Sequence, residues 1–305
     1  MVAGVNCYDW SSMGGQKRWL GQSALAFLAW ARERLLAQED AVLVECVMQF
    51  DHELLAELFD DLYELTVLRV SPSLFGLPVE RQRKYMVLLA KHRVKWIKEV
   101  AEFGPEKAFH SIFAKKVVMS CRDHLRAPPA AIQAYIASLA EKRSMPETRR
   151  SGRKWNCFQV LTPALKASVR RHEQHLLKMK ISLAVPLVVN LIQSPGFIKP
   201  VVGMIPALLR TSLLWSIPDR RLVIPQEYLE LQGYQIFDND EQQCPFLESF
   251  QELSDRKLRQ FMGNAMHLRI VGSCLMFIHS ATQRINSPSL MGGRPRRPDN
   301  SMMDV

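Results

Sequence analysis

No two of the six cysteines in this chain are spaced as Cys-x-x-Cys, so the sequence signals neither a zinc site nor a redox pair, and we expect no metal. Scattered cysteines without a basic and apolar leader at the N-terminus favour a reducing, intracellular compartment. Long apolar runs are also lacking. Residues 181–206, the most apolar stretch, are interrupted by prolines and by Asn190 and Gln193, which argues against a membrane-spanning helix.

Acidic residues are scarce in the middle of the chain. The 305 residues carry a net charge of +10, yet residues 81–180 alone hold 23 Lys and Arg against 7 Asp and Glu, which leaves the flanks acidic. A basic segment of this kind is typical of a surface that faces a polyanion, and we expect nucleic acid as the partner. A solvated basic surface without a partner is the alternative that charge alone leaves open.

Helical and extended patterns alternate over the first 90 residues. Residues 22–38 repeat apolar side chains at helical spacing, and residues 41–47 form a short β-branched run typical of a buried parallel strand. A second short helix is expected at 52–60, with strands at 62–70 and 84–90. This alternation predicts half of an α/β layered domain.

From about residue 95 the pattern changes. Residues 130–143 and 163–179 look helical and basic, and the basic run between them, Arg149 to Lys154, predicts a flexible loop. Residues 195–218 are rich in proline and predict irregular backbone. Further helices are expected at 225–232, closed by Gly233, and over 253–278 with a break near Gly263, and the Gly-, Pro- and Arg-rich tail from residue 287 predicts disorder.

The most specific string runs from Arg221 to Tyr234 and reads Arg-Leu-Val-Ile-Pro-Gln-Glu-Tyr-Leu-Glu-Leu-Gln-Gly-Tyr. It resembles a motif of the cytosine-C5 DNA methyltransferases, in which Arg and Leu precede a Pro-x-Glu helix that ends in Leu-Gln-Gly-aromatic. Taken alone, the string is an ordinary helix closed by a glycine. Four other strings in the order of the same family make the resemblance specific.

Two of these strings lie in the expected strands and loops around residues 40–90. Arg81 and Arg83, at i and i+2 of an extended segment, point to one face and can form a fork toward a base carbonyl or a phosphate. Their segment resembles the Gly-x-Pro-Gln-x-Arg-x-Arg motif of the family, with Val79 in place of Gln. Glu45, at the end of a buried strand where α/β sheets bind ligands, resembles the Glu of Glu-Asn-Val, with Cys46 in place of Asn.

The remaining two strings lie near the ends of the chain. The string from Asn6 onward, Asn-Cys-Tyr-Asp-Trp-Ser-Ser-Met-Gly, resembles the Pro-Cys-Gln-x-x-Ser-x-x-Gly loop that carries the nucleophile of the family, which is Cys7 here. Gly-Asn-Ala-Met at 263–266 resembles the final Gly-Asn-Ser/Ala motif and is expected to open a long apolar helix. Since that motif packs onto the donor site in the family, the resemblance implies that Asn264 and Ala265 contact the cofactor.

The resemblance implies an α/β fold, namely a partial Rossmann-like methyltransferase domain with an inserted, mostly helical, basic target-recognition region. Residues 1–94 would form the C-terminal half of the catalytic domain, with the recognition region at 95–215. A closing segment would span residues 216–285, followed by a disordered tail at 286–305. In this arrangement the basic residues found independently above would face DNA, and the phosphate contacts would include Arg149, Arg150, Arg153 and Lys154.

The resemblance also implies a reaction, in which a methyl group passes from S-adenosylmethionine to C5 of a flipped cytosine through an adduct with Cys7. Glu45 would act at N3 of the ring, and either Arg81 or Arg83 would hold O2. In a eukaryote such a protein would work in the nucleus. RNA is a further possible substrate, because related tRNA enzymes share the Cys loop, but Ser-Ser-Met-Gly is more similar to the DNA branch.

The Gly-rich loop and the acidic residue that bind S-adenosylmethionine in this family have no counterpart here, because only six residues precede Cys7. Three explanations remain open: an incomplete gene product, completion by a second chain that supplies the N-terminal half, or a non-catalytic DNA-binding or regulatory relative. The departures at Asn6, Tyr8, Cys46 and Val79 favour divergence. The presence of Cys7, Glu45, Arg81 and Arg83 favours chemistry that still operates.

Overall fold

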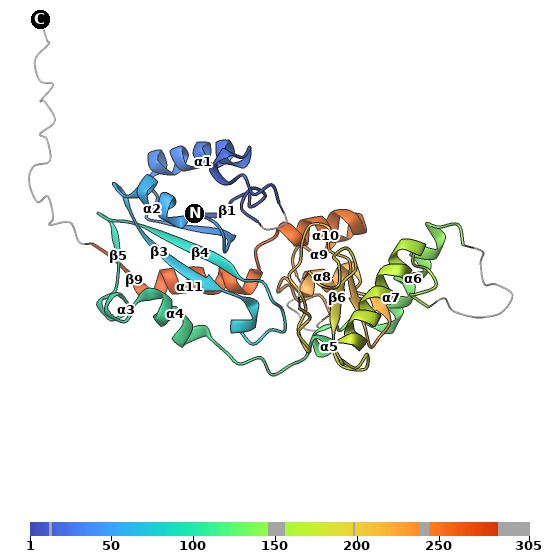
Figure 1. Ribbon diagram of the computed structural model, residues 1–305. Helices are drawn as coiled ribbons and strands as arrows, with labels where there is room; N and C mark the ends of the chain where they lie inside the picture. Colours follow the sequence, from blue (N-terminus) through green and yellow to red (C-terminus); the bar gives the residue numbers. More distant parts are fainter. Residues whose placement is uncertain (12–13, 146–155, 198, 238–243, 286–305) are drawn as a thin grey trace, which may run out of the picture.

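The computed structural model describes residues 1–11, 14–145, 156–197, 199–237 and 244–285. Within them the chain forms two lobes that lie side by side (Figure 1). The sheet lobe comprises residues 1–113 and 268–285, and the second lobe comprises residues 120–264. The mixed α/β architecture predicted from the sequence is confirmed.

The sheet lobe is built on a four-stranded sheet with the order β1-β2-β4-β3. β1 runs parallel to β2, whereas β2 and β3 both run antiparallel to β4, which lies between them. Among the described residues β1 pairs with β2 alone, so its outer edge is free. The strands are β1 (Val2–Gly4), β2 (Ala41–Val47), β3 (Tyr63–Val70) and β4 (Arg83–Ala90).

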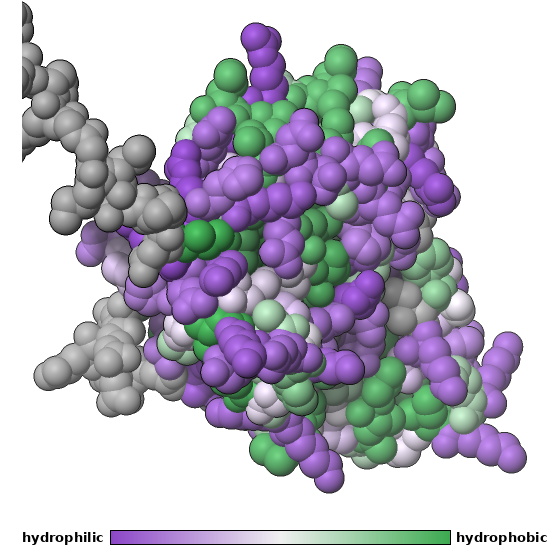
Figure 2. Space-filling model, turned by 90° about the vertical axis from the view of Figure 1, so that its left-hand side faces the viewer, coloured by the Kyte–Doolittle hydropathy of each residue, from purple (hydrophilic) through white to green (hydrophobic). Residues whose placement is uncertain are grey.

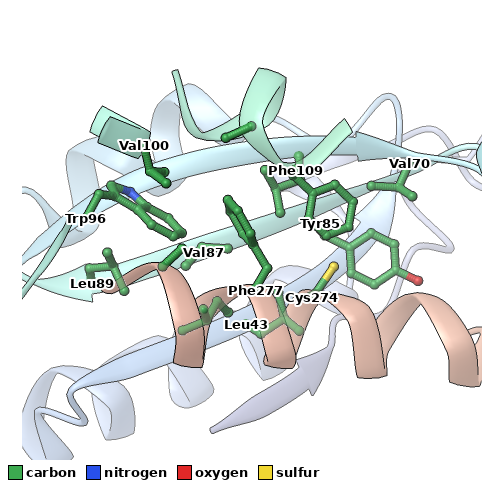
Figure 3. Packing of buried hydrophobic residues seen from close by; sticks show 14 of the residues in the cluster. Leu43, Val70, Tyr85, Val87, Leu89, Trp96, Val100, Phe109, Cys274 and Phe277 are labelled. Atoms are coloured by element: carbon green, nitrogen blue, oxygen red, sulfur yellow. The ribbon is translucent and has the colours of Figure 1, made fainter. Parts of the chain in front are cut away.

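Helices cover both faces of this sheet. Because side chains alternate along a strand, Leu43 of β2 points to one face and Val42 and Val44 to the other. The Leu43 face packs against Phe277 and Cys274 (Figure 3). These two residues lie on α11 (Leu268–Ala281), which shares this face with α3 (Lys98–Phe103) and α4 (Pro105–Phe113), while α1 (Ser23–Ala37) and α2 (His52–Phe59) cover the other face.

α3 and α4 belong to the sheet lobe, although the sequence places residues 95–113 in the recognition region. Phe109 of α4 is fully buried, and its ring lies 5.4 Å from that of Phe277. Glu106 accepts the backbone N–H of Arg69 at 2.8 Å. The basic charge of this segment suggested the other assignment, but its apolar side chains pack on the sheet, and β5 (Val94–Trp96) pairs with β9 (Thr282–Arg284).

The second lobe is mostly helical, but it also contains a small sheet in the order β6-β7-β8. β7 lies within the stretch that the sequence predicts to be irregular, and its Leu214 and Trp215 are fully buried. The strands are too short to show a period-two pattern. The elements are α5 (Cys121–His124), α6 (Pro129–Glu141), α7 (Pro163–Lys178), β6 (Val188–Asn190), β7 (Leu214–Ser216), β8 (Arg221–Leu222), α8 (Pro225–Glu230), α9 (Leu247–Gln251) and α10 (Asp255–Asn264).

The chain returns to the sheet lobe through a break between α10 and α11. The stretch Asp255–Ala281 is long and apolar enough to cross a membrane by length and composition, but it divides at residues 265–267. Gly263 and Asn264 therefore end a helix, whereas the sequence predicts that they open one. The helix ends because Ala265 takes an extended backbone conformation, and Gly263 serves for close packing, since a Cβ there would lie 2.4 Å from the backbone of Leu209 and Arg210.

The other predicted elements agree with the structure to within two residues. Helices form at 23–37, 52–59, 129–141, 163–178 and 225–230. The strand at 41–47 is buried and pairs in parallel with β1, as its β-branched run predicts. The predicted loop from Arg149 to Lys154 and the tail from residue 287 lie outside the described residues.

Candidate functional site

The candidate site lies at the edge of the sheet where β1 and β2 end. Gly4 pairs with Glu45, and the backbone N–H of Val5 donates to the carbonyl of Glu45 at 3.2 Å. Because the two strands are parallel, their carboxyl ends meet at one edge, which is where α/β sheets bind ligands. The chain leaves β1 at this edge and passes directly into the turn that carries Cys7.

Cys7 occupies a turn held by its own backbone. Its carbonyl accepts the N–H groups of Trp10 and Ser11 at 3.0 and 2.8 Å, and the side chain of Asn6 accepts the N–H of Tyr8 at 3.0 Å. Cys7 is partly exposed, whereas the other five cysteines are buried. An electrophile from solvent therefore reaches the thiol of Cys7 most readily.

Glu45 and Arg83 form an ion pair inside the site. Nε of Arg83 lies 3.0 Å from Oε1 of Glu45, and Nη1 of Arg83 donates to the carbonyl of Gln82 at 2.8 Å. Glu45 is 7% exposed, and Oε1 receives no well-directed hydrogen bond. A buried carboxylate with free acceptor capacity is suited to a donor that arrives from outside the chain.

Arg81 has a different environment from Arg83. It is 4% exposed and donates from Nη1 to the carbonyl of Leu208 and from Nη2 to the carbonyl of Ala265, both at 2.9 Å. Burial lowers the pKa of Arg81 to about 10, and the charge of Arg83 acts in the same direction. Both terminal nitrogens of Arg81 therefore already hold the second lobe and the break before α11.

The four predicted catalytic residues lie within electrostatic range of one another. Glu45 and Cys7 both act to raise the pKa of Arg81, against the larger effects of burial and Arg83. The pKa of the Cys46 thiol is raised, first by burial and then by Glu45 and Cys7. The structure thus gathers Cys7, Glu45, Arg81 and Arg83 at one sheet edge.

Two departures from the family pattern are buried. Cys46 lies in the core between the sheet and α1, opposite Lys84 in the strand register. Val79 packs in the core of the second lobe, where it forms a bridge with Ile205. Both side chains act as apolar packing groups, and this explains why an amide at either position is replaced. The β-branched run at 41–47 predicts the burial of Cys46, whereas nothing in the sequence predicts that of Val79.

Asn264 and Ala265, the predicted cofactor contacts, line a cleft of about 490 Å³ beside α10. Arg210 and Lys257 also line it, and no carboxylate does among the residues that the structure describes there. The carbonyl of Ala265 is already bound by Arg81. The lining offers no carboxylate to the sulfonium and ammonium groups of S-adenosylmethionine, although its two cations could pair with the carboxylate of the donor, so the fit is poor.

The second lobe presents a group of cations that the sequence analysis did not single out. Lys166 and Arg170, one turn apart on α7, lie 6.0 Å from the centre of the Phe158 ring, and Arg220 lies 5.5 Å from it. The i, i+4 spacing of the first two is visible in the sequence, but Arg220 joins them only through the fold. The predicted DNA contacts Arg149, Arg150, Arg153 and Lys154 lie outside the described residues.

Groups of three or more His, Cys, Asp or Glu side chains that could hold a metal ion are absent from the described part of the chain. His172 and His175, which share a small cavity in the second lobe, have no carboxylate or thiol close enough to complete such a group there. His172 instead lies with Nε2 3.1 Å from the carbonyl of Gln193, which accounts for its burial.

Comparison with known proteins identifies the fold. No family model matches the sequence, and no curated protein matches it either. A prophage protein from E. coli, assigned as a DNA modification methyltransferase, is 12% identical with a TM-score of 0.53, over 92% of this chain and 78% of that one. Dnmt2 methyltransferase from S. pombe is 14% identical (TM-score 0.48, 92% and 77%), and the Entamoeba histolytica methyltransferase EhMeth is 13% identical (0.47, 92% and 76%). The likeness to the prophage protein shows that this chain shares a methyltransferase fold.

Proposed function

We propose that this protein is cytosine-C5 DNA methyltransferase-like and that Cys7 adds to a cytosine extruded from DNA. The observation that carries the proposal is the convergence of a partly exposed thiol, a buried carboxylate and Arg83 where β1 and β2 end. The fold shared with a prophage DNA modification methyltransferase supports it.

The proposed chemistry begins with the thiolate of Cys7, which forms a bond to C6 of the ring. The electron pair of the C5–C6 double bond moves onto the ring, which makes C5 nucleophilic. Glu45, when protonated, donates to N3 and offsets the negative charge that develops there. Of the two arginines, we assign Arg83 to O2, because Arg81 is committed to two backbone carbonyls.

The methyl donor expected for such a reaction is S-adenosylmethionine. The cleft at Asn264 and Ala265 does not suit it, and we assign no step to those residues. We propose instead that the donor is held by a further α/β segment that pairs with the free edge of β1, either in the same polypeptide or in a second chain.

We propose that the second lobe binds DNA. The cations around Phe158, namely Lys166, Arg170 and Arg220, suit phosphate contacts that set the register of the duplex. The run from Arg149 to Lys154 lies in the sequence between α6 and α7, and we propose that it also contacts DNA. Salt-dependent binding to duplex DNA is the expected property.

A duplex carrying 5-azacytosine tests the nucleophile without a methyl donor, because the ring nitrogen at position 5 makes C6 electrophilic enough for a thiolate. We expect a denaturation-stable adduct located at Cys7 by peptide mass spectrometry. Cys7→Ser removes the adduct, and Glu45→Gln slows its formation by about 10²–10⁴-fold. Glu53→Gln, an exposed carboxylate on α2, is the matched control and should leave the rate unchanged.

The alternative function is a non-catalytic DNA-binding or regulatory relative, which the burial of Val79 and Cys46 favours. It predicts binding of the 5-azacytosine duplex with wild-type affinity by Cys7→Ser and no adduct with the unaltered protein. Calorimetric titration with S-adenosylmethionine adds a second measurement, since the alternative predicts no heat of binding even when a donor-binding segment is supplied. An absent adduct with intact DNA binding would overturn the catalytic proposal.

A further inference from the structure

Asp9, two residues after Cys7, fastens the turn of the nucleophile to α1. Its side chain is nearly inaccessible, with 3% of the residue exposed. Oδ2 of Asp9 accepts the backbone N–H of Ser23 at 3.1 Å and the hydroxyl of Ser23 at 2.5 Å. Ser23 is the first residue of α1, so a carboxylate here also meets the positive end of the helix dipole.

The backbone around Asp9 is shaped to this carboxylate. A Cβ at Gly21 would lie 2.0 Å from Cγ of Asp9, and a Cβ at Gly15 would lie 2.9 Å from Oδ1. Glycine is required at both positions by close approach. The carbonyl of Asp9 also accepts the N–H of Arg18 at 2.9 Å, which ties the turn to the segment before α1 a second time.

The residue that follows Asp9 is constrained as well. Trp10 packs edge-on against Trp19 and Phe50, with ring centres 4.8 and 5.0 Å away. Phe50 follows β2 in the core beneath α1. The turn is thus held on one side by aromatic packing and on the other by Asp9, and Cys7 within it stays partly exposed.

The hydrogen bonds from Ser23 hold the pKa of Asp9 below its ordinary value, so the group is a carboxylate near neutral pH. A helix cap of this kind has a purely structural explanation, in which Asp9 stabilises α1 and has no effect on the thiol. The two explanations predict different effects on Cys7 when Asp9 is changed. Only Tyr8 separates Cys7 from Asp9, so the chain between them cannot absorb a shift of Asp9. A displacement of Asp9 must move the backbone of Cys7.

We infer that Asp9, through Ser23 and the close approach of Gly21, is a positioning residue that fixes the thiol of Cys7 at the carboxyl ends of β1 and β2. The inference rests on the proposed function only in taking Cys7 as the nucleophile. Asp9 acts through the position of the sulfur and not by contact with the base.

The test measures alkylation of Cys7 by iodoacetamide, followed by peptide mass spectrometry from pH 6 to pH 10. In Asp9→Asn the amide oxygen can still accept from both Ser23 donors, but it carries no charge, so both bonds weaken and the turn loosens. We expect the limiting alkylation rate of Cys7 to rise at least fivefold with a shifted midpoint. Ser23→Ala retains the backbone donor, so its alkylation rate should lie between those of Asp9→Asn and the unaltered protein. Ser23→Thr retains both donors, so its alkylation rate should match that of the unaltered protein.

Asp123→Asn is the matched control, because Asp123 caps a helix in the second lobe through Ser120 and lies outside the Cys7 turn. It should lower thermal stability slightly and leave the alkylation profile unchanged. A profile of Asp9→Asn or Ser23→Ala that coincides with the unaltered protein, at whatever stability, would overturn the inference. Should Asp9→Asn not fold, Ser23→Ala against Ser23→Thr decides the same question.

The alkylation result is independent of the proposed function. If the unaltered protein forms no adduct with 5-azacytosine DNA, the proposed function fails while the alkylation profiles still decide the role of Asp9. If it forms the adduct, Asp9→Asn should slow adduct formation by about 10²-fold, the scale expected when a reacting group is displaced by about 1 Å.

Discussion

Each lobe contains a buried Arg–Glu pair, and the two pairs are built differently. In the second lobe Arg221 and Glu227 meet through two bonds of 2.7 Å, and Glu227 also accepts the backbone N–H of Ile224 at 3.0 Å. In the sheet lobe Arg83 reaches Glu45 through one contact of 3.0 Å, and the carboxylate oxygen receives no well-directed hydrogen bond. One carboxylate is satisfied within the protein, and the other is not.

The difference separates a structural pair from a candidate reactive one. The bidentate pair joins β8 to the first turn of α8. The motif from Arg221 to Tyr234 therefore has a structural role, which is to hold these two elements of the second lobe together. Glu45 keeps acceptor capacity at the sheet edge where β1 and β2 end. Substitutions in the first pair should therefore change stability, and substitutions in the second should change chemistry.

The largest effect on stability is expected from Glu227→Ala. Glu227 is fully buried, and its removal leaves the guanidinium of Arg221 uncompensated, which costs about 3–5 kcal/mol of unfolding free energy. Urea denaturation followed by tryptophan fluorescence measures it, since the fully buried Trp215 reports on this lobe. Arg220→Ala, at an exposed ion pair with Glu173, is the control and should cost less than about 1 kcal/mol. Equal losses would contradict the distinction.

The contact of Gly263 with the backbone of Leu209 and Arg210 should tolerate a substitution less well than the exposed Gly272 of α11. Gly263→Ala forces a Cβ against the backbone of Leu209, and overpacking of this kind costs about 1–3 kcal/mol. Gly272→Ala, in α11 with nothing within 4 Å of the added Cβ, should instead stabilise by about 0.5–1 kcal/mol. Thermal unfolding of both variants measures the difference. If Gly263→Ala leaves the stability unchanged, the backbone of Leu209 and Arg210 can move aside to accept the added Cβ.

Mild acid should destabilise the protein through His267, which is 1% exposed and has a pKa lowered to about 3, first by burial and then by Arg81. In the unfolded chain this histidine takes up a proton near pH 6.5, whereas in the folded chain it stays neutral down to a much lower pH. The contribution of neutral His267 to the unfolding free energy is therefore complete above pH 6.5. It is lost as the pH falls from about 6.5 toward 3, by up to about 1.4 kcal/mol per pH unit.

Urea denaturation at pH 7.0 and pH 5.5 measures this slope. His267→Gln should be less stable at pH 7.0 yet lose less on acidification, whereas His92→Gln, at an exposed position, should behave like the unaltered protein. His124 and His172, whose pKa values burial also lowers, supply the slope that remains. An unchanged slope in His267→Gln would place the acid sensitivity elsewhere.

The smallest effect on stability is expected at Glu45. Glu45→Gln keeps the shape of the side chain and removes a carboxylate that is poorly satisfied in the fold, so the unfolding free energy should change by less than about 1 kcal/mol. The same variant should form the Cys7 adduct about 10²–10⁴-fold more slowly. A loss of stability as large as that of Glu227→Ala would mean that Arg83 and Glu45 form a structural pair.

The types of the long elements were predictable from the sequence because local patterns specify them. The bounds of β2, α1 and α7 were predicted to within a residue or two, but the buried face of α1 was not, because Leu25, Leu28 and Leu36 lie exposed and Phe27 and Ala31 pack on the sheet. The candidate residues Cys7, Glu45, Arg81 and Arg83 could also be predicted from the sequence, because the motifs that contain them are defined by residue type and spacing. The surroundings of Asn264 and Ala265 could not, since Arg210 reaches the same cleft only through the fold.

The tertiary structure alone decided which of the two arginines is bound to distant backbone carbonyls. The sequence does not distinguish Arg81 from Arg83, but in the fold Arg81 donates to carbonyls 127 and 184 residues further along the chain. Every residue type has a backbone carbonyl, so the sequence cannot show which carbonyls Arg81 will bind. The packing of α3 and α4 on the sheet and the clamp of Asp9 on Ser23 are likewise long-range or steric facts. The sequence determined what groups exist near the site, and the close packing of distant backbone determined which of them remain available to a ligand.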